Sequence, residues 1–230
     1  MQSLILLHGA LGSKAQFQSL EVSLSKYFYV HSINFSGHGG LSFSSSPFGI
    51  ETFSRELKDY IVSNKLHGAN VFGFSMGGYV ALKLAQSNPD LISKIYTLGT
   101  KFDWNPFSAG QESEKLLPAI IEEKVPKFAA VLNKRHQPND WKALVDSTRE
   151  MMLQLGTNPV LSKADLLEIT NDCQITRGAS DNMVSQQETD WAANHLLFGH
   201  SKELPDTSHP LEKLDNDLLL AALINFFKIN

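Results

Sequence analysis

Cysteine is nearly absent from this sequence, which has one thiol, Cys173, among 230 residues. A single thiol excludes an intramolecular disulfide and leaves no thiol cluster to bind zinc. A chain without disulfides fits a reducing compartment. The sequence offers no other cluster of metal ligands and no sign of a cofactor, so we expect neither a metal nor a cofactor.

A large excess of charge and long apolar runs are also lacking. Twenty basic residues against 24 acidic ones give a net charge of −4, so no broad basic surface is expected for nucleic acid or an anionic membrane. The apolar run Leu4 to Leu7 is too short for a signal peptide or a membrane span, and no basic segment precedes it. We therefore expect a cytoplasmic protein that binds a small molecule; no particular oligomeric state is indicated.

Strand-like and helix-like segments alternate over the first hundred residues and again near the end. The strand-like runs are 4–7, 27–33, 69–74, 91–98, 173–176 and a weak one at 201–204. The helix-like runs between them are 16–26, 53–61, 79–85, 186–194 and 215–228. This alternation predicts an α/β fold, with a predominantly parallel sheet of about six strands and helices on both faces.

The middle of the chain departs from the alternation. From 102 to 169 the pattern is helical only and is interrupted by several prolines. We interpret residues 102–169 as a helical cap inserted between two strands of the sheet. Residues 1–101 and 170–230 then form the core.

The segment Gly73-Phe74-Ser75-Met76-Gly77-Gly78 is the most informative motif. It lies between a buried strand-like run and a helix-like run, which predicts that Ser75 is presented as a nucleophile on a sharp turn. Side chains at Gly73 and Gly77 would collide with the neighbouring strand and helix. The following helix directs its N–H groups and positive dipole end at the serine, where an oxyanion would form. The alternative is a helix N-cap in a glycine-rich turn.

The loop after the first strand-like run, His8 to Ser13, is expected to aim backbone N–H groups at the same point. We predict an oxyanion hole made by the N–H groups of Ala10 and Met76, with Leu11 as a substitute for Ala10. His8 is expected to hydrogen-bond the backbone. His38, in the next strand-end turn, needs no chemical role.

Two further strand-end loops supply an acid and a base. Ligand sites in parallel sheets lie at the carboxyl ends of the strands. Asp181, which follows the run 173–176, is placed to accept a hydrogen bond from an imidazole Nδ1 and so fix its tautomer. Asp103 is the alternative candidate for this acid. His209, before the last helix, is the candidate base. The remaining histidines are interpreted as surface or packing residues: His31, His67, His136, His195 and His200.

The order Ser75, Asp181, His209, each on a different strand-end loop, resembles the α/β-hydrolase family. Members share this nucleophile turn, this chain order and a His-Gly turn ahead of the nucleophile. Two departures stand out: the chain starts without the family's N-terminal hairpin, so we predict an all-parallel, six-stranded sheet, and Asn34 stands where members often have aspartate. The asparagine affects the hydrogen bonding of the local loop and not the triad.

The resemblance implies acyl transfer to water. His209 would deprotonate Ser75, which attacks an ester or thioester carbonyl, while Asp181 stabilises the imidazolium. Water activated by His209 would then release the acyl group of a small-molecule substrate. The candidate substrate contacts are Leu11, Trp104, Phe107 and Trp141, with Phe128, Met151 and Met152 as further apolar side chains of the cap.

Alternatives within and outside this chemistry stay open. The serine argues against the family branches that use aspartate, the haloalkane dehalogenases and epoxide hydrolases. The turn also resembles that of the pyruvate-eliminating synthase of menaquinone biosynthesis, although Tyr79 stands where an arginine is expected and Arg135 or Arg149 would have to substitute. Cofactor-free perhydrolases share a similar turn. A ligand-binding receptor or scaffold that retains the triad is the alternative of another class.

Overall fold

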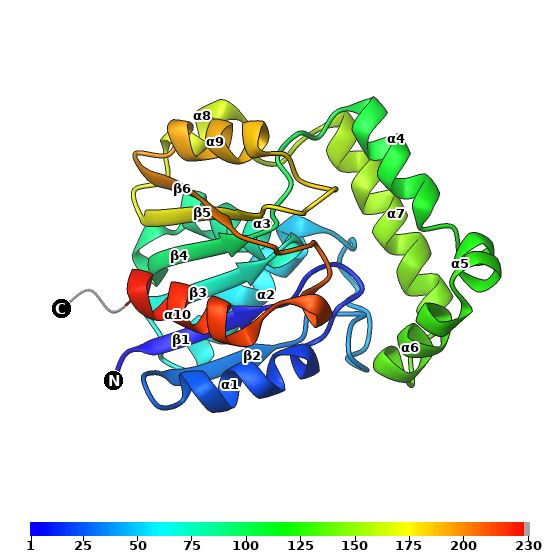
Figure 1. Ribbon diagram of the computed structural model, residues 1–230, viewed down its shortest axis with the longest axis horizontal. Helices are drawn as coiled ribbons and strands as arrows, with labels where there is room; N and C mark the ends of the chain where they lie inside the picture. Colours follow the sequence, from blue (N-terminus) through cyan, green and yellow to red (C-terminus); the bar gives the residue numbers. More distant parts are fainter. Residues whose placement is uncertain (228–230) are drawn as a thin grey trace.

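Six parallel strands form the central sheet of the computed structural model, which describes residues 1–227 (Figure 1). The spatial order is β2-β1-β3-β4-β5-β6, and every neighbouring pair is parallel. The strands are β1 (Ser3–Leu7), β2 (Tyr29–Ile33), β3 (Ala69–Phe74), β4 (Ile92–Leu98), β5 (Asp172–Gly178) and β6 (Phe198–Leu204). The predicted six-stranded, all-parallel sheet is confirmed.

Strand β1 shows why both faces of the sheet need a cover of helices. Successive side chains of a strand point to opposite faces. Leu4 and Leu6 therefore join one apolar cluster and Ile5 and Leu7 another, and all four are fully buried. Helices α1 and α10 cover the first face, and α2, α3 and α9 cover the second. These helices are α1 (Gln18–Leu24), α2 (Ile50–Ser63), α3 (Met76–Ser87), α9 (Gln186–His195) and α10 (Asn216–Phe227).

Some boundaries differ from those predicted. Strand β2 begins at Tyr29 instead of residue 27, because the Phe28 N–H donates to the Leu24 carbonyl and prolongs the end of α1. Strand β6 begins three residues earlier than predicted; it is an edge strand with mostly exposed side chains, so its apolar pattern is weak. Short 3₁₀ turns precede α1 (η1, Lys14–Phe17), β4 (η2, Pro89–Leu91) and α10 (η3, Leu211–Lys213). Lys228, the last residue of the predicted terminal helix, lies outside the described residues.

The connection between β4 and β5 contains five helices and no strand, and all of its residues are described. The helices are α4 (Pro106–Lys115), α5 (Pro118–Lys124), α6 (Pro126–His136), α7 (Trp141–Thr157) and α8 (Lys163–Leu167). Proline opens α4, α5 and α6, where its missing N–H costs no helical hydrogen bond. Helix α4 lies along α7 to one side of the sheet, whereas α8 packs against α9 (Figure 1). We call 106–157 the helical segment.

Candidate active site

Ser75 occupies the sharp turn between β3 and α3. Its backbone has φ 50° and ψ −116°, in the left-handed half of conformational space that residues other than glycine rarely adopt. Neighbours hold this conformation: the Ser75 N–H donates to the Leu98 carbonyl at 2.8 Å, and the Ser75 carbonyl accepts from Thr100 Oγ1 at 2.9 Å. Strain of this kind persists only where the surroundings fix the backbone, so the turn presents the serine rigidly.

The glycines around Ser75 allow close backbone contacts. A Cβ at Gly73 would lie 2.4 Å from the backbone of Gly78, and a Cβ at Gly77 would lie 2.5 Å from the Leu7 carbonyl oxygen. Any side chain at either position would therefore push α3 away from β3 or from the end of β1. The contact at Gly77 brings the first turn of α3 beside the loop that follows β1.

Asp181 and His209 form a hydrogen-bonded pair. His209 Nδ1 lies 2.8 Å from Asp181 Oδ2, and Asp181 Oδ1 accepts from the N–H groups of Met183 and Val184 at 2.8 and 3.0 Å. Burial alone would raise the pKa of Asp181, but the contact with His209 and the two backbone donors outweigh it and hold the pKa below its usual value. The aspartate therefore stays ionised and fixes the His209 ring with its Nδ1 proton directed at the carboxylate.

The pair lies beside the serine turn. Phe74, which precedes Ser75, has its ring centroid 5.5 Å from that of His209. Among residues 1–227, no hydrogen bond joins Ser75 Oγ to His209. Catalytic hydrogen bonds of this kind are often long in the free enzyme and shorten when substrate binds. Asp103, the reserve acid, has no contact with the histidine: its carboxylate accepts from the Asn105 side chain at 2.9 Å.

The two predicted oxyanion donors border one small cavity with Ser75. Met76 is the first residue of α3, so its N–H has no acceptor within the helix. In the loop after β1, Gly12 N–H donates to the Gly9 carbonyl at 3.0 Å, a turn bond that uses neither the Ala10 nor the Leu11 N–H. Ala10, Ser75 and Met76 all line a cavity of about 30 Å³, which is room for roughly one water molecule.

The helical segment forms hydrogen bonds with the loop that carries Ala10. The Leu11 carbonyl accepts from Arg135 Nη1 at 2.9 Å and from His136 Nε2 at 3.0 Å. Arg135 Nη2 also lies 2.6 Å from the Glu212 carboxylate, which accepts from Gln16 Nε2 at 2.8 Å. Leu11 itself has φ 57°, so these contacts hold a strained residue. The sequence interpretation of His136 as a surface or packing residue did not include this hydrogen bond, because Leu11 is 125 positions away in the sequence.

Three buried histidines lie beneath this loop. His8 Nδ1 donates to the Gly9 carbonyl at 2.8 Å, and its Nε2 accepts from the Phe35 N–H at 3.2 Å, which confirms the expected backbone contact. Burial lowers the pKa of His8 and of His136 to about 4, and it also lowers the pKa of His38 well below the usual value. All three are neutral near pH 7, and none contacts the Asp181–His209 pair.

Asn34 supplies its own loop contacts. Its Oδ1 accepts from the Lys14 N–H at 2.8 Å, and its Nδ2 donates to the Gly39 carbonyl at 3.2 Å. An aspartate at this position lacks the second donor. The asparagine therefore joins the loops after β1 and β2 by hydrogen bonds.

The predicted substrate contacts separate into two groups. Trp104 lines the cavity with Ser75. Leu11 and Trp141 pack instead in an apolar cluster with α5, α6 and α7, and the Phe107 side chain is 73 % exposed. The side chains that complete the cavity wall are Ile50, Tyr79, Lys101, Met151, Met152, Leu155 and Met183. Of these, sequence reasoning considered only Met151 and Met152 as possible lining. Lys101 lies three residues past the end of β4, so its place in a strand-end loop could have indicated it.

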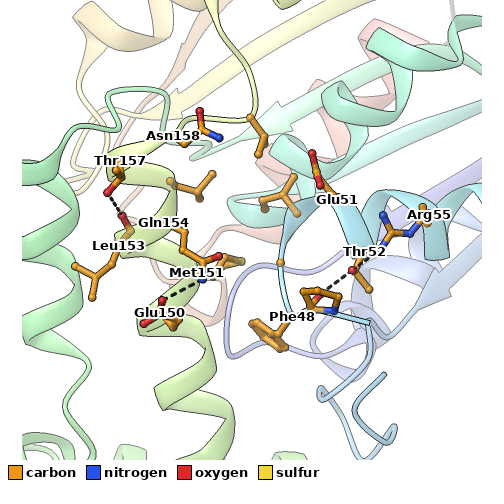
Figure 2. A pocket seen from close by; sticks show the side chains of 15 residues that line it. Phe48, Glu51, Thr52, Arg55, Glu150, Met151, Leu153, Gln154, Thr157 and Asn158 are labelled. Carbon is orange, nitrogen blue, oxygen red and sulfur yellow. Dashed lines mark hydrogen bonds between the residues drawn. The ribbon is translucent and has the colours of Figure 1, made fainter. Parts of the chain in front are cut away.

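A larger groove of about 760 Å³ lies next to the cavity, between residues 47–55 and α7. Ile50, Met151 and Leu155 line both spaces, so the groove adjoins the cavity at Ser75. Figure 2 shows the two walls of the groove, with Phe48, Thr52 and Arg55 on one side and Glu150, Met151 and Gln154 on the other.

The described residues contain neither a cluster of metal ligands nor a helix suited to a membrane. No three side chains of His, Cys, Asp or Glu within 1–227 come close enough together to hold a metal ion. Over the same residues, every helix is too short or too polar to cross a bilayer.

Comparison with known proteins gives consistent matches. A family model described as "alpha/beta hydrolase fold" matches residues 2–193. Human serine hydrolase-like protein 2 is 24 % identical over 95 % of this chain and 67 % of its own length. A pimeloyl-[acyl-carrier protein] methyl ester esterase of Aliivibrio fischeri is 27 % identical over 52 % of this chain and 44 % of its own length. The chain thus spans about half to two-thirds of the length of these relatives. The crystal structure of an enol-lactonase from Burkholderia xenovorans covers 99 % of this chain and 92 % of that one, with a TM-score of 0.79 at 18 % identity.

Proposed function

We propose, since this chain belongs to the α/β-hydrolase fold family, that it is a serine hydrolase that cleaves a small-molecule carboxylic ester or thioester through an acyl-enzyme. Ser75 is the nucleophile, His209 the base and Asp181 the acid. The N–H groups of Ala10 and Met76 form the oxyanion hole. Relatives named as esterases and serine hydrolases support this class of reaction.

The observation that carries the proposal is the 2.8 Å hydrogen bond between His209 and Asp181, formed beside the strained turn at Ser75. In the neutral imidazole, an Nδ1 that donates to the carboxylate leaves Nε2 without a proton, so Nε2 can accept the Ser75 hydroxyl proton. The serine oxygen then attacks the carbonyl carbon, and the negative charge that develops on the carbonyl oxygen is stabilised by the two N–H groups. His209 returns the proton to the leaving group and next activates the water that releases the acid.

We also propose that residues 102–169 act as a cap over a core formed by 1–101 and 170–230. The cavity at Ser75 holds roughly one water, so an acyl substrate enters only when apolar side chains such as Met151 move aside. The adjoining groove of about 760 Å³ is large enough for the rest of a small-molecule substrate.

The lyase alternative has less support from the cap. Arg135 is engaged by the Leu11 carbonyl and Glu212, and Arg149 by the Ser113 carbonyl and Asp146. Neither arginine lines the cavity at Ser75, where Tyr79 lies instead. No comparable observation favours a perhydrolase or a receptor.

A substrate panel on one preparation tests the proposal. The panel contains short and long p-nitrophenyl esters, acyl-CoA thioesters and the menaquinone-pathway intermediate, with Ser75→Ala as the blank. We expect turnover of at least one ester or thioester by the native chain only. Elimination of pyruvate from the intermediate with no ester hydrolysis would replace the proposal by the lyase, and binding without any turnover would replace it by a receptor.

A further inference from the structure

Lys101 is the one charged side chain among the described residues that line the Ser75 cavity. It lies on the loop directly after β4, three residues past the strand end, and its side chain is only 10 % exposed. The other side chains of the cavity wall, apart from Ser75 and the Tyr79 hydroxyl, are apolar. A buried ammonium in such a wall is costly unless a partner compensates for the lost hydration.

The charged end of Lys101 lies at the cavity wall. Its Nζ is 3.4 Å from the Met183 carbonyl oxygen and 5.8 Å from the centroid of the Trp104 ring. Met183 and Trp104 both line the cavity with Ser75. A neighbouring pocket also has Trp104 in its wall, but Lys101 is not among the residues that line it. The ammonium therefore lies between Met183 and Trp104, which line the serine's cavity, and Glu188, which lines the neighbouring pocket.

Within the described chain, Lys101 has a buried ion-pair partner and one hydrogen-bond acceptor. An ammonium has three N–H donors, and the Met183 carbonyl is the only acceptor within 3.5 Å in residues 1–227. Its ion-pair partner Glu188 is 3.8 Å away, beyond hydrogen-bond distance. The two Glu188 oxygens already accept the N–H groups of Asp103 and Ser185, at 2.8 and 2.7 Å. Lys101 thus has donors to spare.

We propose that Lys101 binds a carboxylate of the substrate, so that this enzyme acts on esters or thioesters that carry a carboxylate a few carbon atoms from the reacting carbonyl. The spacing is short because Lys101 and Ser75 border the same small cavity. An anionic group would supply the ammonium with the charge-assisted hydrogen bonds it lacks. The inference rests on the proposed function, since it takes Ser75 as the nucleophile.

A structural role for Lys101 predicts a different result. Met183, whose carbonyl contacts Lys101, also donates its N–H to Asp181, so loss of the lysine would disturb the acid as well. That disturbance lowers the turnover of every ester alike. Binding of a carboxylate instead concerns only substrates that carry one, and it acts on their KM.

Matched pairs of esters separate the two roles. Monomethyl succinate, glutarate and adipate each have a neutral isostere in which an isopropyl group replaces the carboxylate. We expect the native chain to prefer the charged ester in at least one pair. In Lys101→Met the ratio of kcat/KM between charged and neutral ester should fall on the order of 10- to 100-fold, mainly through KM, as for loss of a hydrogen bond between charged groups. Lys101→Arg should recover part of the ratio, and Lys163→Met, in the wall of the neighbouring pocket, should leave it unchanged.

Competition supplies a test that needs no variant. Glutarate should inhibit hydrolysis of a neutral ester competitively, and glutaramide at the same concentration and ionic strength should not. Equal turnover of both members of every pair, an unchanged ratio in Lys101→Met, or equal inhibition by glutarate and glutaramide would overturn the proposal while the serine hydrolase stands. Failure of the proposed function looks different: no ester of either kind is hydrolysed and a fluorophosphonate does not label Ser75.

Discussion

The strand-end loops and the helical segment border the same cavity, but they are held in place by different means. Ser75, Asp181 and His209 follow three different strands, and short hydrogen bonds hold each of them. Around Ser75, the backbone contacts at Gly73 and Gly77 are too close to admit a side chain. The helical segment reaches the cavity with apolar side chains from α7. Its polar contacts with the rest of the chain include Arg135 and His136 on the Leu11 carbonyl.

This difference separates two kinds of constraint on the sequence. Under the proposed function, the chemical identity of a residue matters in the loops, because hydroxyl, imidazole and carboxylate have distinct roles in proton transfer. In the helical segment volume and apolarity matter, so many side chains suit one position. Changes to the loops should therefore affect kcat far more than stability. Changes to the helical segment should have smaller effects on both, except at the residues that hydrogen-bond the Leu11 carbonyl.

Ser75→Ala gives the largest expected effect. Removal of the nucleophile should lower kcat on the order of 10⁶-fold, if the subtilisin precedent transfers. Stability should change little, because the replaced hydroxyl makes no hydrogen bond in the described chain. Steady-state ester hydrolysis and thermal unfolding measure the two effects. Activity within tenfold of the native chain would contradict the role of the loop.

Asp181→Asn should lower kcat on the order of 10⁴-fold, as the same change does in the serine proteases, because the amide no longer fixes the His209 tautomer. Asp103→Asn is the matched control. Its carboxylate contacts the Asn105 side chain and not His209, so its kcat should stay close to native. The reverse pattern, with Asp103→Asn inactive and Asp181→Asn active, would assign the acid to the other strand-end loop.

Arg135→Met tests the point where the two regions meet. Loss of its contacts to Leu11 and Glu212 should loosen the turn that carries the Ala10 N–H and lower kcat about 10-fold, less than loss of a whole oxyanion donor. Arg149→Met is the control, because within residues 1–227 Arg149 bonds only to Ser113 and Asp146, both in the helical segment. An equal fall in kcat for both variants would show that the helical segment acts through general packing.

Acid should weaken the same junction. His8 and His136 have pKa values of about 4 in the folded chain and about 6.5 when unfolded, so the unfolded state binds more protons between these values. The free energy of unfolding therefore falls as the pH drops from 7.5 to 5, by about 2 kcal/mol from His8 alone. Urea unfolding at the two pH values measures the loss, and His136→Gln should reduce it. Equal stability at both pH values would contradict the buried neutral histidines.

Phe107→Ser should have the smallest effect. Its side chain is 73 % exposed on the helical segment, so the free energy of unfolding should change by less than about 0.5 kcal/mol. The specificity profile over short and long esters should stay the same within about twofold, since Phe107 lies outside the cavity wall. A large loss for long esters alone would instead return Phe107 to the substrate contacts that the sequence predicts.

The sequence predicted the parts of the molecule that follow from local rules. The alternation of buried strands and amphipathic helices yields the sheet, and each loop at a strand end is confined to one edge of it. Two observations therefore agree with expectation. One cavity is lined by Ser75, Ala10 and Met76, and a hydrogen bond joins His209 to Asp181. No comparable rule predicts the contacts between irregular segments that are far apart in the sequence. Two features depend on how the helical segment packs. They are the hydrogen bonds from Arg135 and His136 to the Leu11 carbonyl, and the burial of Trp141 away from the cavity.

The most direct test of the account is the site of covalent labelling by a fluorophosphonate, located by peptide mass mapping. The account predicts one phosphonyl group per chain, on Ser75, and none on the Ser75→Ala variant. Absence of any adduct on the native chain, or an adduct on another residue that persists in Ser75→Ala, would contradict the assignment of Ser75 as the nucleophile.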